Sequence, residues 1–199
     1  MISFKGKFNE VPLKKFKKLY EMAFEKKQLN IEAACISTIG KNNQPDGRFV
    51  NIKYFSSEGL TFFSNYESPK AQQIKKNKKV SITFFWPTID CQIRIKAFGK
   101  KIPLTESDNH FSIRSHSKNA LAISSMQSKE IKSYIEVKKK YDEVFNTHNI
   151  DLHQRPSYWG GFILNPFYYE FWTAHPSRIN KREAYEYNKN KWKKKILEP

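Results

Sequence analysis

The stretch Arg48-Phe49-Val50-Asn51-Ile52-Lys53 places a cation at each end of an alternating segment that is typical of a strand. Phe63-Ser64 lies at the end of the next apolar run, and Ser68-Pro69-Lys70-Ala71 begins a segment with helical spacing. Cations, hydroxyl groups and the free N–H groups of a helix start can together bind one phosphate dianion. From the residues alone an alternative stays open, in which these are ordinary surface lysines beside a hairpin.

Around this stretch the apolar pattern predicts a mainly β fold. Five predicted strands fall between residues 32 and 103, and Ser68 is a plausible cap for one short helix that ends near Asn77. The strands are expected at Ala33–Ile39, Phe49–Phe55, Leu60–Asn65, Val80–Trp86 and Cys91–Ile102. Several strands with a single inserted helix favour a meandering barrel over a βαβ sheet.

Helices are predicted to flank the barrel within a single domain over residues 1–199. Helical spacing predicts an opening helix over 11–27, and a helical middle follows over 105–145. In that middle, Thr105 is the expected cap of its first helix, and a charged helix is expected from about Lys129. Closing strands are predicted over 160–197.

The net charge of +17 raises the question of nucleic-acid binding. Lysines in many short clusters supply most of this charge, which is typical of a solvated surface, so a nucleic-acid partner is not expected. The few arginines are more informative, because a guanidinium can grip phosphate or carboxylate through two hydrogen bonds. They are Arg48, Arg94, Arg114, Arg155, Arg178 and Arg182.

Several other classes of protein lack their motifs in this sequence. Templates for dinucleotide, nucleotide triphosphate and serine-hydrolase sites do not occur. Cys35 and Cys91 are interpreted as core residues, and His110, His116, His148, His153 and His175 show no metal-ligand spacing, so no metal is expected. No apolar run is long enough to span a membrane, and a cytoplasmic location is expected.

The motifs together resemble the pyridoxamine 5′-phosphate oxidase family. The resemblance begins with the stretch quoted above and runs from about Pro12 to Pro199. Further motifs follow in the family's order: Gln92-Ile93-Arg94-Ile95, Gln127-Ser128, Tyr158-Trp159-Gly160-Gly161-Phe162, Glu170-Phe171-Trp172 and Arg178-Ile179-Asn180-Lys181-Arg182. The resemblance implies an FMN-binding split β-barrel that works as a homodimer.

The resemblance also implies a set of cofactor-binding residues. Arg48, Lys70, Gln127 and Ser128 are expected to hold the phosphate and ribityl end of FMN. The other implied FMN residues are Phe49, Val50, Lys53, Phe63, Ser64, Ser68, Gln92, Trp172 and Arg182. In the family the site lies between two subunits, so Gln92, Gln127, Trp172 and Arg182 are expected to meet an FMN held mainly by the partner chain.

The substrate side departs from the family pattern. The resemblance places the substrate phosphate near a lysine, a tyrosine, an arginine and a serine, and this sequence has Lys53, His110, Arg114 and Lys118 there. The family's catalytic Arg-x-His element is here Arg178-Ile179-Asn180, and an amide cannot titrate near neutral pH. Pro69 also stands where the family usually has an arginine beside Lys70.

Two activities follow from this comparison. In the first, pyridoxamine or pyridoxine 5′-phosphate is oxidised to pyridoxal 5′-phosphate with O₂ as acceptor, and Arg178 orients the substrate. In the second, the scaffold and FMN are retained but the substrate differs, as in the phenazine-pathway oxidases that resemble this family. A flavin-binding protein without turnover is a third alternative.

Overall fold

Buried and more exposed side chains alternate along the central strands, as expected for a sheet with one face against a core. The computed structural model describes residues 1–147 and 149–199. The strands are β1 (Ser3–Phe4), β2 (Ala33–Ile39), β3 (Pro45–Asn51), β4 (Tyr54–Ser56), β5 (Gly59–Asn65), β6 (Lys79–Trp86), β7 (Cys91–Lys101), β8 (Trp159–Thr173), β9 (Lys181–Asn188) and β10 (Lys191–Leu197). The α-helices are α1 (Val11–Glu25), α2 (Pro69–Lys76), α3 (Leu104–Ser112), α4 (His116–Ser124) and α5 (Tyr134–Asn146).

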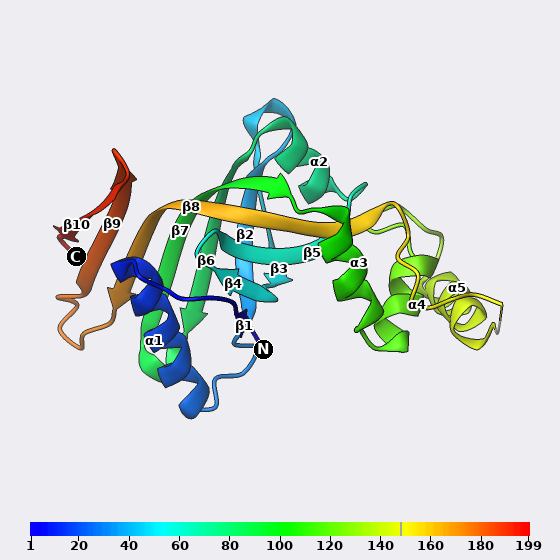
Figure 1. The fold of residues 1–199 in the computed structure, drawn as a ribbon, viewed down its shortest axis with the longest axis horizontal. Coiled ribbons are helices and arrows are strands. Elements are labelled where there is room, and N and C mark those ends of the chain that lie inside the picture. The colour runs from blue at the N-terminus through cyan, green and yellow to red at the C-terminus, as the bar shows by residue number, and fades with distance from the viewer. Residues whose placement is uncertain (148) are drawn as a thin grey trace.

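These strands form one curled sheet in the order β1-β4-β5-β8-β7-β6-β2-β3, and β9 and β10 continue from β8. The β1–β4 pair is parallel, and the other pairs are antiparallel. The predicted meander is interrupted, because β5 pairs with β8 and not with β6. In Figure 1, α2 carries the chain over the top of the sheet between β5 and β6, and β8 crosses the molecule.

The curl of the sheet is completed where β3 passes into β4. The sequence predicts one strand over Phe49–Phe55, but the chain changes partner inside this stretch. Ile52 N donates to the carbonyl oxygen of Glu32 at 2.9 Å, and Lys53 N donates to that of Thr61 at 2.8 Å. The chain therefore leaves β2 and joins β5 at this seam, which explains why the predicted strand is divided.

α1 closes one end of the barrel with the apolar face that its spacing predicts. Phe16 stacks on Phe55 with ring centroids 4.6 Å apart and meets the edge of Phe84 at 5.3 Å. All three rings are fully buried, and burial of such a ring stabilises the fold by on the order of 2 kcal/mol. The helix ends at Glu25 and not at Lys27, because Lys27 has a left-handed backbone with φ of 55°.

The helical middle predicted over 105–145 is divided into α3, α4 and α5. α3 begins at Leu104, and Pro103 occupies the N-cap position, so the expected cap at Thr105 is wrong. Thr105 instead lies inside the first turn, where a side-chain cap has no role.

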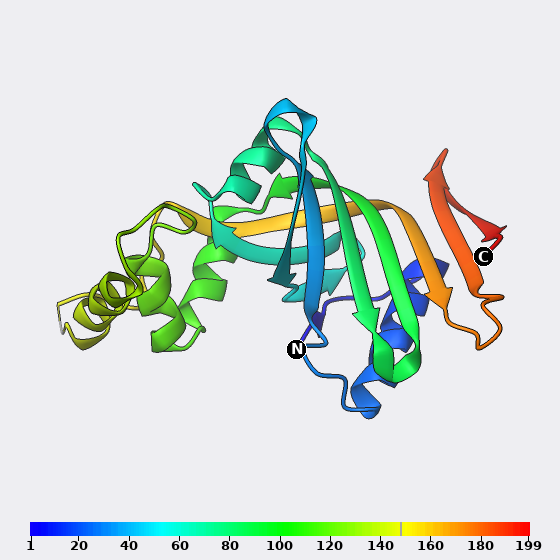
Figure 2. The same ribbon diagram turned by 180° about the vertical axis from the view of Figure 1, so that it is seen from behind.

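α5 begins later than the charge pattern predicts. The expected start near Lys129 is wrong, because the Ser133 hydroxyl accepts a hydrogen bond from Glu136 N and begins the helix at Tyr134. In Figures 1 and 2, α3, α4 and α5 gather at one end of β8, and the β9–β10 hairpin lies at the other. Within the described residues, no helix combines the length and apolar character that crossing a bilayer requires.

Candidate functional site

A cavity of about 460 Å³ lies where β3 and β5 meet the start of α2 and the α3–α4 region. It unites side chains that are far apart in the sequence. The predicted site residues in its lining are Arg48, Phe49, Val50, Lys53, Phe63, Ser64, Lys70, His110, Arg114, Lys118, Gln127 and Ser128. One hollow therefore receives cations from the barrel, from α2 and from the α3–α4 region.

Lys70 is a buried ammonium group in the first turn of α2. It is 7% exposed, and its Nζ donates to the Ser68 hydroxyl at 3.2 Å. Among the described residues, no carboxylate forms an ion pair with it. Burial and the neighbouring Arg48 guanidinium lower the pKa of Lys70 to about 8. A buried cation with unused hydrogen-bonding capacity favours an anionic ligand.

Two buried hydroxyl groups lie beside this lysine. Ser68 occupies the N-cap position of α2 as predicted, but its side chain makes no capping hydrogen bond. Its Oγ lies 3.3 Å from Ser64 Oγ and accepts the hydrogen bond from Lys70. Both serines are almost fully buried. The hydroxyl pair and the ammonium group thus form one compact polar cluster at the positive end of the α2 dipole.

Gln127 reaches the same cluster from the loop after α4. Its Oε1 accepts hydrogen bonds from Ser64 Oγ at 3.0 Å and from Asn65 N at 3.3 Å. Ser128 has a left-handed backbone with φ of 67° and also lines the cavity. The structure therefore places Gln127 in the cavity lining of its own chain, apart from Gln92, Trp172 and Arg182, with which the family resemblance groups it.

The Arg48 guanidinium is held by its own chain. It forms an ion pair with Asp46, and it donates to Thr38 Oγ1 at 2.6 Å and to Gln73 Oε1 at 3.3 Å. Its side chain keeps 22% of its surface exposed. Asp46 therefore compensates part of the Arg48 charge, whereas Lys70 has no such partner.

Arg114 is the second cation without an acidic partner in the described part of the chain. Its guanidinium carbon lies 4.5 Å from the centroid of the Trp159 ring, and its Nη2 donates to the Lys118 carbonyl oxygen at 3.1 Å. Its Nη1 is buried with no hydrogen-bond partner among the described residues, and burial lowers the pKa of Arg114 to about 10. Stacking on Trp159 orients the guanidinium and leaves Nη1 for a ligand.

Lys53 and Lys118 add positive charge to the cavity. The Nζ of Lys53 lies 3.5 Å from Glu32 Oε1, and its side chain is 30% exposed. Lys118 is an exposed residue of α4. Both line the same cavity as Arg114. An anion in this cavity is therefore attracted by cations from three separate elements.

His110 contributes a flat ring to the same region. It stacks on Phe63 with centroids 3.8 Å apart and planes 8° from parallel. Its Nδ1 lies 2.7 Å from the Tyr54 hydroxyl oxygen. Burial, together with Arg114, Lys53 and Lys5, lowers the pKa of His110 to about 4. The imidazole is therefore neutral at physiological pH.

Gln92, Trp172 and Arg182 form a row of cross-strand neighbours on the sheet. Gln92 on β7 is paired in register with Trp172 on β8, which is paired with Arg182 on β9. Arg182 donates to Glu170 Oε1 through Nε at 3.0 Å and Nη2 at 2.8 Å. The cavity lining does not include these residues. The described chain therefore presents them on a surface separate from its own cavity.

The predicted catalytic residues Arg178 and Asn180 lie in the turn between β8 and β9. Arg178 is exposed and has a left-handed backbone with φ of 63°. Asn180 Oδ1 accepts a hydrogen bond from His175 N at 3.1 Å, and this bond stabilises the turn. Within the described chain, the structure does not bring these two residues into the cavity lining.

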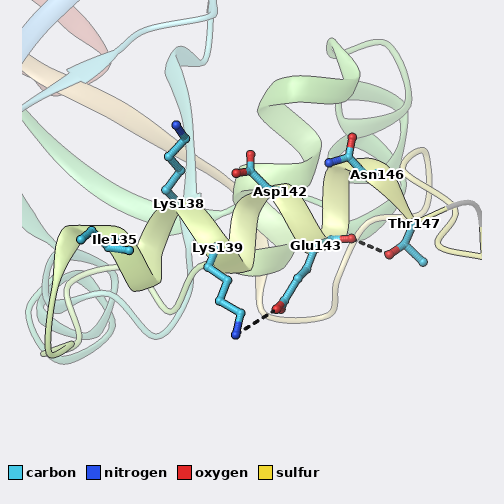
Figure 3. A pocket seen from close by; sticks show the side chains of 7 residues that line it. All are labelled: Ile135, Lys138, Lys139, Asp142, Glu143, Asn146 and Thr147. Carbon is cyan, nitrogen blue, oxygen red and sulfur yellow. Dashed lines mark hydrogen bonds and ion pairs between the residues drawn. The ribbon is translucent and has the colours of Figure 1, made fainter.

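A larger hollow, of about 670 Å³, runs along the outer surface of α5. Figure 3 shows that its side chains come from this helix and the residue after it, and that Lys139 pairs with Glu143. One helix face cannot surround a ligand, so this hollow is not a candidate site. Among the described residues, no three metal-binding side chains converge. The predicted surface residue His148 lies outside the described residues.

Several lining residues were not predicted from the sequence. They are Asn51, Asn65, Leu121, Ala122, Ser125 and Trp159. Trp159 was visible only as part of a family motif, because its contact with Arg114 joins positions far apart in the chain. Tyr54 was also missed, although it directly follows Lys53. Tyr54 is relevant because its hydroxyl group contacts His110, and no local sequence pattern predicts this contact.

The curled sheet and the cavity at its seam, lined by cations without acidic partners in the described chain, define a split β-barrel with a site suited to anionic ligands. The family model described as pyridoxamine 5′-phosphate oxidase matches residues 23–148, and the pyridoxine 5′-phosphate oxidase C-terminal dimerisation region matches residues 159–199. The chain belongs to the pyridoxamine 5′-phosphate oxidase family. This confirms the family that the motifs predicted.

Curated relatives that are named pyridoxine/pyridoxamine 5′-phosphate oxidase align with most of this chain. A pyridoxine/pyridoxamine 5′-phosphate oxidase of Hydrogenovibrio crunogenus is 37% identical over 175 residues, which are 88% of this chain and 81% of the relative. The enzyme of that name from Haemophilus influenzae strain Rd is 33% identical over 191 residues, covering 96% and 90% of the two chains.

Solved structures confirm the predicted fold. PhzG from Burkholderia lata 383, in complex with tetrahydrophenazine-1-carboxylic acid, superposes with a TM-score of 0.90 at 22% identity and covers 99% of this chain and 100% of its own. A pyridoxamine 5′-phosphate oxidase-related, FMN-binding protein from Nostoc punctiforme gives 0.78 at 15% identity, covering 96% and 100%. At these identities the likeness shows the fold and not the substrate.

Proposed function

We propose that the chain is an FMN-dependent oxidase that converts pyridoxine or pyridoxamine 5′-phosphate to pyridoxal 5′-phosphate, with O₂ as acceptor. The observation that carries this proposal is one cavity with two separate cations, Lys70 and Arg114, that lack acidic partners among the described residues. A reaction between a flavin nucleotide and a phosphorylated substrate requires two anions to bind side by side. Relatives at 33–37% identity that are named for this activity support it.

The residues around Lys70 fit the phosphate group of FMN. A buried ammonium, two buried hydroxyl groups and the nearby Arg48 supply the hydrogen bonds and the charge that a dianion needs. Gln127 and Ser128 would then lie along the ribityl chain. Phe49, Val50, Lys53 and Phe63 would line the remaining contact. The chemistry that FMN supplies when bound is removal of a hydride from the substrate's C4′ carbon.

The residues around Arg114 would hold the substrate phosphate. Nη1 of Arg114 is free to donate, and Lys53 and Lys118 bring further charge. His110 is neutral and stacked, so it contributes a hydrogen bond and no charge. This arrangement positions the substrate by its phosphate and leaves the oxidation to the flavin.

A homodimer would complete the site. Residues 159–199 match the family's dimerisation region and include Trp172, Arg178, Asn180 and Arg182. The row formed by Gln92, Trp172 and Arg182 lies on a surface apart from the cavity of its own chain. In a two-fold dimer such a row can face the cavity of the partner subunit. We infer that each chain completes the FMN site of the other, and that Arg178 reaches the substrate in the same way.

A second candidate function is oxidation of a different substrate by the same scaffold, such as a dihydro-aromatic compound of the phenazine type. The departures at His110, Lys118 and Asn180 favour it, since all three fall on the substrate side of the family pattern. The Asn180 side chain accepts a hydrogen bond from His175 N within the β8–β9 turn, and its amide cannot titrate as a histidine would.

The test begins with the absorbance spectrum of the purified protein. Flavin bands at about one FMN per chain are expected, and pyridoxine 5′-phosphate added without air should bleach them. This anaerobic step should yield one pyridoxal 5′-phosphate per flavin reduced, and admission of air should restore the colour and yield peroxide. Bleaching by dihydro-aromatic compounds, with no pyridoxal product, would replace the first function by the second. A colourless protein that ignores added FMN would refute both.

A further inference from the structure

The Tyr54 hydroxyl contacts the candidate substrate site from outside. Tyr54 lies on β4 and faces a neighbouring groove that also contains Lys5 and Glu106. Its oxygen lies 2.7 Å from Nδ1 of His110, a residue of the cavity lining. Tyr54 itself is not part of that lining. The Tyr54 ring also meets the edge of the Phe63 ring with centroids 6.0 Å apart, but its hydroxyl group reaches the cavity lining through the imidazole of His110.

Stacking fixes the plane of this imidazole. The ring of His110 lies 3.8 Å from Phe63, and the Phe63 ring lies 5.2 Å from Trp159 at an angle of 10°. Three nearly parallel rings leave the plane little freedom. They do not distinguish the two ring orientations that differ by a half turn about the Cβ–Cγ bond, because both keep the same plane. The hydrogen bond to Tyr54 makes that distinction by holding Nδ1.

The charges around the pair decide which atom carries the proton. Lys5 Nζ lies 3.7 Å from the centroid of the Tyr54 ring, and Arg114 and Lys53 also face His110. These cations disfavour the imidazolium, while burial and Glu106 raise the pKa of Tyr54. The pair therefore consists of a neutral phenol and a neutral imidazole. A phenol that donates to Nδ1 leaves the single imidazole proton on Nε2.

We propose that Tyr54 is a positioning residue for substrate binding, which holds His110 in the tautomer whose Nε2–H donates to the phosphate group of the substrate. This inference rests on the proposed function, since it concerns the same cavity. The other tautomer would turn a lone pair toward the anion that Arg114 and Lys53 attract, and it would repel that anion. A hydroxyl group outside the cavity thus sets the sign of an interaction inside it.

Tyr54→Phe tests the proposal, because it removes the hydroxyl and keeps the ring. The KM for pyridoxine 5′-phosphate is expected to rise about threefold, because only the fraction of His110 in the Nε2–H tautomer binds the phosphate, while kcat changes by much less. Nitrogen-15 NMR of the His110 ring should show the proton on Nε2 in the unaltered protein and a mixture of tautomers in the variant. Tyr158→Phe is the matched control, since it removes a hydroxyl that donates to the Ile123 carbonyl oxygen at 2.8 Å.

A double-mutant cycle separates positioning from general damage. In a His110→Phe background, Tyr54→Phe should have no further effect on KM, because the group that it positions is absent. An unchanged KM in Tyr54→Phe, an equal increase in both backgrounds, or a proton on Nδ1 in the unaltered protein would overturn the proposal.

Failure of the proposed function would look different. If the flavoprotein turns over neither phosphorylated compound, two quantities can still be measured. They are the affinity of inorganic phosphate for the cavity and, by NMR, the tautomer of His110. A weaker phosphate affinity in Tyr54→Phe than in Tyr158→Phe would then sustain the role of Tyr54 for another phosphorylated ligand. Equal phosphate affinities in the two variants would refute it.

Discussion

Arg48, Lys70, Arg114 and Arg182 are all cations of predicted importance, but their surroundings differ. Asp46 pairs with Arg48, and Glu170 pairs with Arg182. Lys70 and Arg114 have no acidic partner among the described residues, and both have a lowered pKa. A compensated guanidinium can stabilise the fold without any ligand, whereas an uncompensated buried cation gains most from an anion.

The Lys70 ammonium makes cofactor affinity depend on pH. Its pKa of about 8 in the free protein lies below the ordinary value, and a bound phosphate raises it again. The association constant for FMN should therefore be constant between about pH 7 and 8, where the FMN phosphate is a dianion, and fall as the pH rises above 8 by up to about tenfold per pH unit. Titration of apoprotein with FMN, followed by quenching of flavin fluorescence, measures this. Lys70→Arg should remove the dependence, and a decline that persists in this variant would contradict the assignment.

Arg48→Ala and Asp46→Asn distinguish a ligand from a structural ion pair. If Arg48 binds the FMN phosphate, Arg48→Ala should weaken FMN binding by on the order of 2–4 kcal/mol. Asp46→Asn should preserve or strengthen binding, because it removes a negative charge beside Arg48. Both changes should lower the free energy of unfolding of the apoprotein. Equal flavin content in Arg48→Ala and in the unaltered protein would restrict Arg48 to a structural role.

At the scale of elements, the β9–β10 hairpin is held against α1 by a cluster of charges. Glu183 on β9 lies 2.6 Å from Lys15 Nζ on α1, and Lys181 and Lys194 approach its carboxylate at 3.0 and 3.2 Å. These lysines hold the pKa of Glu183 at about 2, although burial alone would raise it. Because Arg182 precedes Glu183, this cluster also fixes the row that we assign to the partner's cavity.

Glu183→Gln should destabilise the protein near neutral pH. The folded pKa of Glu183 lies below the unfolded value of about 4.5, so its stabilisation is present above pH 4.5 and is lost as the pH falls toward 2. Urea unfolding at pH 7 should show a loss on the order of 2 kcal/mol, and the difference between variant and unaltered protein should shrink at pH 3. Glu186 lies on β9 like Glu183 and forms an exposed ion pair with Lys195 on β10, so Glu186→Gln is the control. A loss that is equal at both pH values would exclude the ionic explanation.

At the scale of the whole molecule, the site is divided between two surfaces. The cavity opens beside β3, β5 and the helices, and the row of Gln92, Trp172 and Arg182 lies elsewhere on the sheet. Phe85 on β6 is paired in register with Gln92 and extends this row with a ring that is 60% exposed in the single chain. A large exposed ring beside predicted cofactor residues is typical of an interface.

Phe85→Asp should therefore separate the subunits. We expect sedimentation velocity to show a dimer for the unaltered protein and a shift toward monomer for the variant, with loss of bound flavin in parallel. Folding should be retained, because the Phe85 ring contributes little to the core. Phe24→Asp on α1, where the ring is 52% exposed, is the matched control and should stay dimeric. A Phe85→Asp variant that stays dimeric and keeps one bound FMN per chain would show that the interface lies elsewhere.

The amino-acid sequence by itself determined the kinds of element and most of the residues around the cavity. Periodicity and turn residues act between neighbours in the chain, so the opening helix and the barrel strands could be predicted from local pattern. Motif order likewise identified the family, and Arg48, Ser64, Lys70 and Arg114 were predicted before any contact was known.

Only the tertiary structure decided how the site works. The pairing of β5 with β8 and the change of partner at Lys53 depend on strands that are distant in the sequence. Ion pairing likewise depends on side chains that folding brings together, so Asp46 pairs with Arg48, whereas Lys70 forms no ion pair among the described residues. The contact of Tyr54 with His110 has the same origin, because it joins two elements that no local pattern relates. Local patterns place residues along the chain, but electrostatic and hydrogen-bond energies depend on distances in space.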